Sequence, residues 1–264
     1  MNNGHIHHGS GNSLEYMLLL LIAIILMLYI LAAVLSNRRH KRWPLQRTLF
    51  WIFGVLCTAA AIVGPLADRA HMDFTAHMLS HLLLGMLAPI LIALSAPMTL
   101  VLRTLHVKTA RRLSNLLKSW PVRTISDPIV AAFLNLGGLW ILYMTNLYSA
   151  MQQNMLLHLF MHLHIFIAGY LFTISLIYID PTPHRSSFIY RAIVLVIASA
   201  SHGILAKYIY AQPPNGVPAA QAEIGSMIMY YGGDAIDAIL IFIFCLQWFK
   251  ASRPKTKTHE SISS

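Results

Sequence analysis

Long runs of apolar residues, separated by short polar segments, dominate the pattern along this chain. Seven of the runs approach or exceed the roughly 20 residues that an α-helix needs to cross a bilayer. They cover residues 14–35, 48–67, 74–102, 128–148, 154–179, 188–210 and 225–249. The pattern therefore predicts an all-α, polytopic membrane helix bundle with seven transmembrane helices.

Proline and aspartate residues mark several of the expected helix ends. Asp127 precedes Pro128, an order typical of a helix start, because aspartate caps the first turn and proline fits the first helical position. A proline-rich segment, residues 180–183, is expected to end the fifth helix. Because the third run contains Pro89 and Pro97, we expect a kink or a break within it.

The composition agrees with a membrane protein. Of the 264 residues, 57% are hydrophobic and only 11% are charged, whereas soluble domains carry about 25% charged residues. This excludes an ordinary soluble protein, a disordered chain and a disulfide-rich secreted module. We expect a leader at residues 1–13, a seven-span domain at 14–249 and a tail at 250–264. Because the leader has no lysine or arginine, the first run is not expected to be a cleaved signal peptide.

The basic residues are distributed unevenly between the connecting segments. The formal net charge is +10, and 17 of the 19 lysine and arginine residues fall in every second connection or in the C-terminal tail. Cytoplasmic loops carry an excess of such residues. The distribution therefore predicts an N-terminus outside the membrane and a C-terminus in the cytoplasm. It also explains the basic charge without nucleic acid as a partner.

Five histidines fall within three of the expected spans. His77 and His81 are four residues apart in the third span, and His158 and His162 have the same spacing in the fifth. Each pair therefore lies on one helix face. With His202 in the sixth span, all five are expected about 5 to 12 Å below the outer boundary, from the helical rise of 1.5 Å per residue.

This layer of histidines is a candidate metal site. Imidazole groups within a bilayer normally face the bundle interior; they suit copper and zinc, and thioethers favour Cu(I). For any single histidine of this set, a hydrogen bond between helices is a simpler interpretation than a metal ligand. The helical period turns His164 away from His162, so His164 is not included in the candidate metal site. Possible secondary ligands are Asp73, His71, Met151, Met155, Asp234 and Asp237, and the leader histidines His5, His7 and His8 are candidates for weak metal capture.

Several stretches resemble one known family. The stretches are residues 74–97, which begin FTAHMLSHLLLGMLAP, HLFMH at 158–162, SHGIL at 201–205, and 225–230, which end in MIMY. In this order they resemble the CtaG-type cytochrome c oxidase assembly factors, from about residue 47 to residue 249. Members of that family typically carry an Asp-Gln pair before the last span, whereas this chain has Gln-Ala-Glu at residues 221–223.

The resemblance implies a non-enzymatic protein of the bacterial plasma membrane that is needed to build an active haem–copper oxidase. It implies that the protein helps copper, as Cu(I), to reach the oxidase. The expected partners are cytochrome c oxidase subunits, an extracytoplasmic copper donor and the lipid bilayer. The histidine layer would then be the place where copper is held.

Other functions use similar residues. A seven-span, ceramidase-like zinc hydrolase could use Asp73 and the two histidine pairs to activate water. A haem-binding electron carrier is less compatible, because axial haem ligands come from opposite faces of the ring. The histidine boxes of a di-iron desaturase are expected on the cytoplasmic side, where only scattered histidines occur. The identity of the bound metal, and whether the protein turns over a substrate, would separate these functions.

Overall fold

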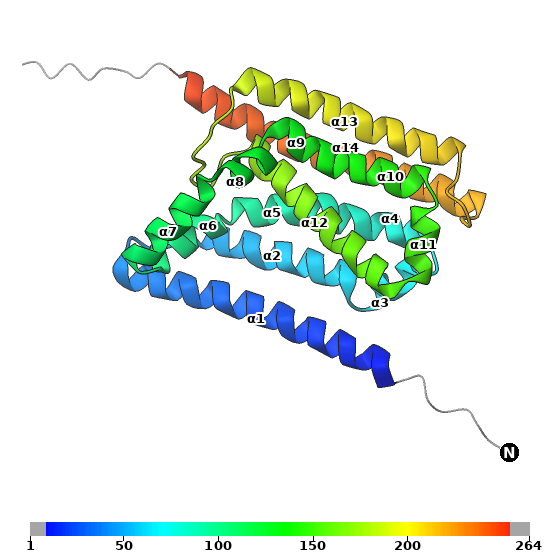
Figure 1. Ribbon diagram of the computed structural model, residues 1–264, viewed down its shortest axis with the longest axis horizontal. Helices are drawn as coiled ribbons and strands as arrows, with labels where there is room; N and C mark the ends of the chain where they lie inside the picture. The colour runs from blue at the N-terminus through cyan, green and yellow to red at the C-terminus, as the bar shows by residue number, and fades with distance from the viewer. Residues whose placement is uncertain (1–8, 254–264) are drawn as a thin grey trace, which may run out of the picture.

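The computed structural model describes residues 9–253, and all of its regular elements within that range are helices. Helices pass back and forth between two ends of the molecule (Figure 1). In chain order they are α1 (Gly9–Arg39), α2 (Leu45–Ile62), α3 (Pro65–Ala70), α4 (Phe74–Leu82), η1 (Leu83–Leu87), α5 (Ala88–Leu94), α6 (Pro97–Thr104), α7 (Val107–Leu117), α8 (Trp120–Ile125), α9 (Pro128–Ala132), η2 (Phe133–Gly137), α10 (Gly138–Met144), α11 (Leu147–Gln153), α12 (Met155–Leu176), α13 (Phe188–Ala211) and α14 (Ala219–Ser252).

The two ends differ in character. One end carries α6, α7 and α8, and we call it the basic end because the lysine- and arginine-rich connections lie there; the opposite end carries α3 and α11 (Figure 1). Helix α1 begins at the opposite end, within the expected leader, and α14 finishes at the basic end (Figure 1). The leader histidines His5, His7 and His8 lie outside the described residues.

Among residues 9–253, six helices are long and apolar enough to span a membrane. The predicted fourth span is the exception. Residues Pro128–Met144 run from the basic end to the opposite end, and Leu147–Gln153 then turns away by 81°. The prediction of seven spans is therefore confirmed for six helices, and the seventh requires that this bent pair be counted as one span.

The start of α9 follows the predicted pattern. The Asp127 carboxylate accepts a hydrogen bond from the backbone N–H of Ile129 at 3.0 Å, and Pro128 occupies the first helical position. The capping that the sequence predicted is confirmed.

The third apolar run is interrupted twice, as its prolines predicted. A π-helical turn, η1, precedes Pro89, and the chain breaks at Ala96, whose φ is 53°, before Pro97 begins α6. Because Pro89 has no backbone N–H, it cannot donate the usual helical hydrogen bond to the carbonyl of Gly85. A π-helical turn accommodates such a fault inside a helix.

The carbonyl of Gly85 lies against α12 at Gly169. A Cβ atom built at Gly169 would collide with this carbonyl oxygen, and one built at Gly85 would lie 2.8 Å from Cγ2 of Ile165. Only glycine therefore allows the two backbones to approach this closely. The contact holds α12 directly against the continuous helical stretch formed by α4, η1 and α5.

Helix α14 uses glycines in the same way. A Cβ atom at Gly225 would lie 2.8 Å from the ring of Phe74, and one at Gly233 would collide with the ring of His202. Helix α14 continues as a single α-helix through this region. The glycines therefore allow neighbouring side chains to approach α14 closely, and they do not interrupt α14.

The basic end contains two helices that the sequence analysis did not predict. Helices α7 and α8 lie in the connection between the third and fourth apolar runs. The Asp180 carboxylate accepts hydrogen bonds from the backbone N–H groups of Met98 and Thr99, at 3.1 and 2.7 Å, and so caps α6. The segment after α12 is thereby tied to the break after α5.

Replacing Gly169 with alanine should force α12 away from Gly85. We expect the free energy of unfolding to fall by about 1 to 3 kcal/mol, the usual cost of overpacking a tight contact. Thermal unfolding of the detergent-solubilised protein measures the change. Gly137→Ala is the matched control, because its Cβ atom would come no closer than 3.8 Å to a neighbour. Equal stability of the two variants would contradict the close-contact account.

Candidate functional site

The five predicted histidines lie on three packed helices near the opposite end of the bundle. Helix α4 carries His77 and His81, α12 carries His158 and His162, and α13 carries His202. All are buried except His158, which is half-buried. The helical period placed each pair on one face, and the glycine contacts of α12 and α14 bring these faces together.

Four histidines form a row that leads from the surface inward. His71, exposed in the turn after α3, stacks on His158 with ring centroids 4.3 Å apart. His158 stacks on His162 at 4.2 Å, and His162 meets the ring of His77 edge-on at 6.4 Å. We call these four residues the histidine row. Its outermost member was only a secondary candidate in the sequence analysis.

The other two histidines form a separate pair. The rings of His81 and His202 are stacked with centroids 6.2 Å apart. Both line a cavity of about 20 Å³ together with Asp237, whose side chain is buried. A space of this size holds about one water molecule. Because His81 lies one helical turn beyond His77, this pair continues inward from the histidine row.

Hydrogen bonds leave several imidazole nitrogens free. Nδ1 of His162 donates to the backbone carbonyl of His158 at 2.9 Å, which leaves Nε2 of His162 with its lone pair. Nε2 of His77 is 3.0 Å from the hydroxyl of Tyr143. The buried ring nitrogens without a protein partner are Nδ1 of His77, both nitrogens of His81, Nδ1 of His158 and Nε2 of His202. Buried polar atoms without partners are costly, so these nitrogens are suited to a ligand.

The histidines are arranged in neighbouring pairs and not around a single point. Within the described part of the chain, no three histidine, cysteine, aspartate or glutamate side chains come together as a ready-made metal site. The structure thus brings the predicted residues together, but in a row and a pair. Their role as metal ligands stays a prediction.

The secondary candidates fall into different places. Met155 is 65% exposed and Asp234 is also exposed, so neither belongs to the buried set of residues. Met151 is buried in an apolar cluster with Phe74 and Tyr148, and both of these rings pack against His77. Of the secondary set, Met151, His71 and Asp237 therefore lie beside the five histidines.

Asp73 has a structural role at the start of α4. Its carboxylate accepts a hydrogen bond from the backbone N–H of Thr75 at 2.9 Å and so caps the helix that carries His77. His164 points away from the row, as the helical period predicted. Its Nε2 lies 3.2 Å from the carbonyl of Leu134 in η2, which accepts the hydrogen bond.

Gln221 positions the site and was missed as a functional residue. Its side-chain oxygen accepts a hydrogen bond at 3.1 Å from the backbone N–H of Phe74, the first residue of α4. The side chain therefore ties the start of α14 to the helix that carries His77 and His81. The only sequence signal was the Gln-Ala-Glu segment, which departs from the pattern of the resembling family.

Comparison with known proteins identifies the family. The family described as cytochrome c oxidase caa3 assembly factor (Caa3_CtaG) matches residues 27–251. This chain belongs to that family. The match agrees with the resemblance seen in the sequence. It places the chain among the cytochrome c oxidase assembly factors.

Relatives occur among mycobacterial proteins. Uncharacterized proteins of Mycobacterium bovis and Mycobacterium tuberculosis are each 35% identical over 158 residues, which is 56% of this chain and 24% of theirs. One from Mycobacterium leprae is 30% identical over 183 residues, which is 66% of this chain and 28% of its own. The chain thus spans about a quarter of the length of these relatives. No solved structure matches it.

Replacing Gln221 with alanine should loosen the start of α4. We expect a loss of about 1 kcal/mol in the free energy of unfolding, the typical value of one hydrogen bond. Amide hydrogen exchange at Phe74 and in the first turn of α4 should speed up. Gln153→Ala, an exposed position at the end of α11, is the control and should leave both quantities unchanged. Unchanged exchange in the Gln221 variant would refute the positioning role.

Proposed function

We propose that this protein supplies copper to a haem–copper cytochrome c oxidase during assembly and that Cu(I) passes along the histidine row. The observation that carries the proposal is the sequence of ring contacts from exposed His71 through His158 and His162 to buried His77. Family membership supports the recipient, because the family is described by its role in oxidase assembly.

The donor chemistry fits this cargo. Imidazole nitrogens bind copper, and they bind it in the neutral form. Each neighbouring pair offers nitrogens that no protein group occupies. A copper ion held by one pair meets the next pair before it leaves the first, so it moves by exchange of ligands. Met151, buried beside the rings around His77, adds a soft thioether that favours Cu(I).

We further propose that the basic end faces the cytoplasm of a bacterium. The positive-inside rule supports this orientation, since 17 of the 19 basic residues belong to the basic end or the C-terminal tail. His71 then faces the extracytoplasmic side, where a copper donor delivers the ion. The oxidase subunits receive it from the same side of the plasma membrane.

The geometry gives less support to the zinc hydrolase. Such a site holds one zinc ion with three protein ligands and keeps a fourth position open for water. The described histidines contact one another in pairs, and Asp73 is engaged in capping α4. A row suits transport of an ion along the protein better than activation of water at one point.

Replacing His77 or His162 with alanine should weaken Cu(I) binding at least about tenfold, because metal affinity depends strongly on each contributing imidazole. The variants should still accumulate, since alanine is tolerated in a bilayer. Cells that depend on them should lose cytochrome c oxidase activity. Competition titration against a Cu(I) chelator and oxidase assays measure the two effects.

His164→Ala is the matched control for these variants. It lies on the same helix as His162, and its loss removes the hydrogen bond to Leu134 and the ring contact with Phe160. Copper binding and oxidase activity should stay near wild type. Normal binding and normal activity in the His77 and His162 variants would refute copper handling by this row.

The orientation is tested by labelling single cysteines in a background that lacks Cys57 and Cys245. A cysteine at Gln153, exposed at the end of α11, should react with a membrane-impermeant thiol reagent added to intact cells. A cysteine at Asn115, exposed on α7 at the basic end, should react only after the cells are opened. The reverse pattern would place the histidine row on the cytoplasmic side.

A further inference from the structure

Helix α7 lies at the basic end of the bundle, next to α6 and α8 (Figure 1). Two residues connect α6 to α7, two connect α7 to α8, and two connect α8 to α9. Because α6 ends the third apolar run and α9 begins the fourth, these short links hold α7 close to the membrane boundary. The proposed copper route does not use α7.

Helix α7 is amphipathic. With 3.6 residues per turn, Leu113, Leu116 and Leu117 fall on one side of the helix, and Lys108 and Arg111 fall on the other. All of its lysine and arginine residues are exposed. A helix with this separation of apolar and basic residues is typical of one that lies in the plane of a membrane surface.

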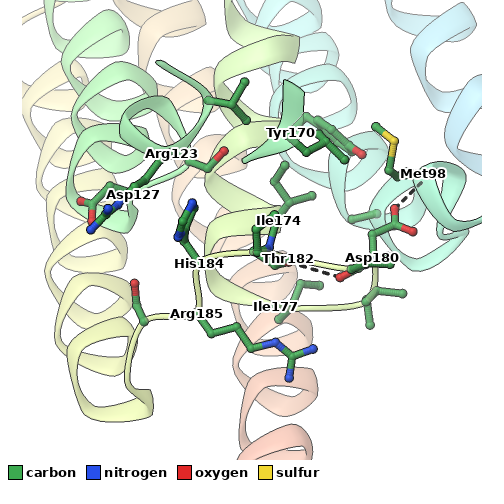
Figure 2. A pocket seen from close by; sticks show the side chains of 18 residues that line it. Met98, Arg123, Asp127, Tyr170, Ile174, Ile177, Asp180, Thr182, His184 and Arg185 are labelled. Carbon is green, nitrogen blue, oxygen red and sulfur yellow. Dashed lines mark hydrogen bonds between the residues drawn. The ribbon is translucent and has the colours of Figure 1, made fainter. Parts of the chain in front are cut away.

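The bundle covers the leucine side of α7 only in part. Neither α7 nor α8 contains a buried residue. Leu116 is 60% exposed, and Trp120 at the start of α8 is 76% exposed. A cavity of about 480 Å³ remains at this place, lined by Leu117 of α7 and by Ile174 of α12 (Figure 2). Another partner is therefore needed to cover the apolar groups that the bundle leaves exposed.

The charge of this region indicates what the partner is. Residues 74–126 contain no aspartate or glutamate, and six lysine and arginine residues fall between positions 103 and 123. The cavity itself has a mixed lining, with Asp127 and Asp180 as well as Arg123 and Arg185 (Figure 2). The unbalanced positive charge thus lies on the exposed side of α7. An anionic lipid surface matches this charge, and it also offers acyl chains to exposed leucine and tryptophan side chains.

We propose that α7 lies on the surface of an anionic lipid leaflet, with its leucine side toward the acyl chains and its basic side among the headgroups. The lipid contacts supply the apolar burial that the bundle does not provide. The two-residue links keep the helix at the leaflet, so its effective concentration there is high. This interaction surface is independent of copper binding.

Nitroxide labels on the full chain in lipid nanodiscs test the proposal. In a background that lacks Cys57 and Cys245, a label is attached to Leu116→Cys or to Asn115→Cys, an exposed position on the basic side. In dioleoylphosphatidylglycerol, the label at 116 should collide with oxygen, which dissolves in acyl chains, several-fold more often than with a water-soluble nickel chelate. The label at 115 is the matched control and should show the opposite preference.

The variant K108Q/R111Q/R112Q, combined with the label at 116, tests the role of charge. It should weaken the partition of α7 onto the leaflet roughly 100-fold, since each basic residue near an anionic surface contributes about a factor of five. The oxygen preference at 116 should then be largely lost, and it should also be lost in zwitterionic dioleoylphosphatidylcholine. The variant K108R/R111K/R112K keeps the three charges and should keep the preference.

Three results would overturn the proposal. A label at 116 that prefers the nickel chelate in dioleoylphosphatidylglycerol would place the leucine side of α7 in water. A label that meets neither reagent would show that protein, and not lipid, covers this side. An oxygen preference that persists in K108Q/R111Q/R112Q, or in dioleoylphosphatidylcholine, would show that anionic lipid is not what α7 recognises.

Discussion

The contact between the backbones of Gly85 and Gly169 determines how closely the helices that carry the histidines can approach. Pro89 cannot donate a hydrogen bond to the carbonyl of Gly85, and the π-helical turn η1 absorbs the fault. That carbonyl lies where a side chain at Gly169 would have to sit. One proline, one irregular turn and two glycines thus set the separation between α4 and α12, and with it the 6.4 Å between the rings of His77 and His162.

The polar interior is expensive for a membrane protein, and its cost argues for a function. Imidazoles within a bilayer need partners, yet both ring nitrogens of His81 are buried without one. The hydrogen bonds around the histidines hold helix α4 and the His162 ring in place. Asp73 and Gln221 fix the start of α4, and the carbonyl of His158 fixes the tautomer of His162. The remaining free nitrogens include those that the proposed copper route uses.

Much of this architecture was predictable because helical periodicity and hydrophobic length are local properties. The four-residue spacing of His77 and His81, and of His158 and His162, places each pair on one face without any tertiary information. The prolines at 89 and 97 predicted the interruptions in the same way. The orientation of His164 followed from the same rotation per residue.

What the sequence left open depends on contacts between distant segments. The stacking of His71 on His158 requires the turn after α3 to fold over α12, and no local pattern encodes that turn. The split into a row and a pair depends on the rotation of each helix about its axis. Helices α7 and α8 were missed because their basic residues indicated a connecting loop. The hydrogen bond from Phe74 to Gln221 could not be predicted, because it joins residues 147 positions apart.

X-ray absorption spectroscopy of the Cu(I)-loaded protein at the copper edge can show whether the histidine row holds the ion. We expect nitrogen scatterers with the multiple-scattering signature of imidazole. That signature should weaken in a variant in which His77, His158 and His162 are alanine, and it should be unchanged in His164→Ala. A copper environment made of sulfur alone, or an imidazole signature unchanged in the triple variant, would show that the histidine row does not hold copper.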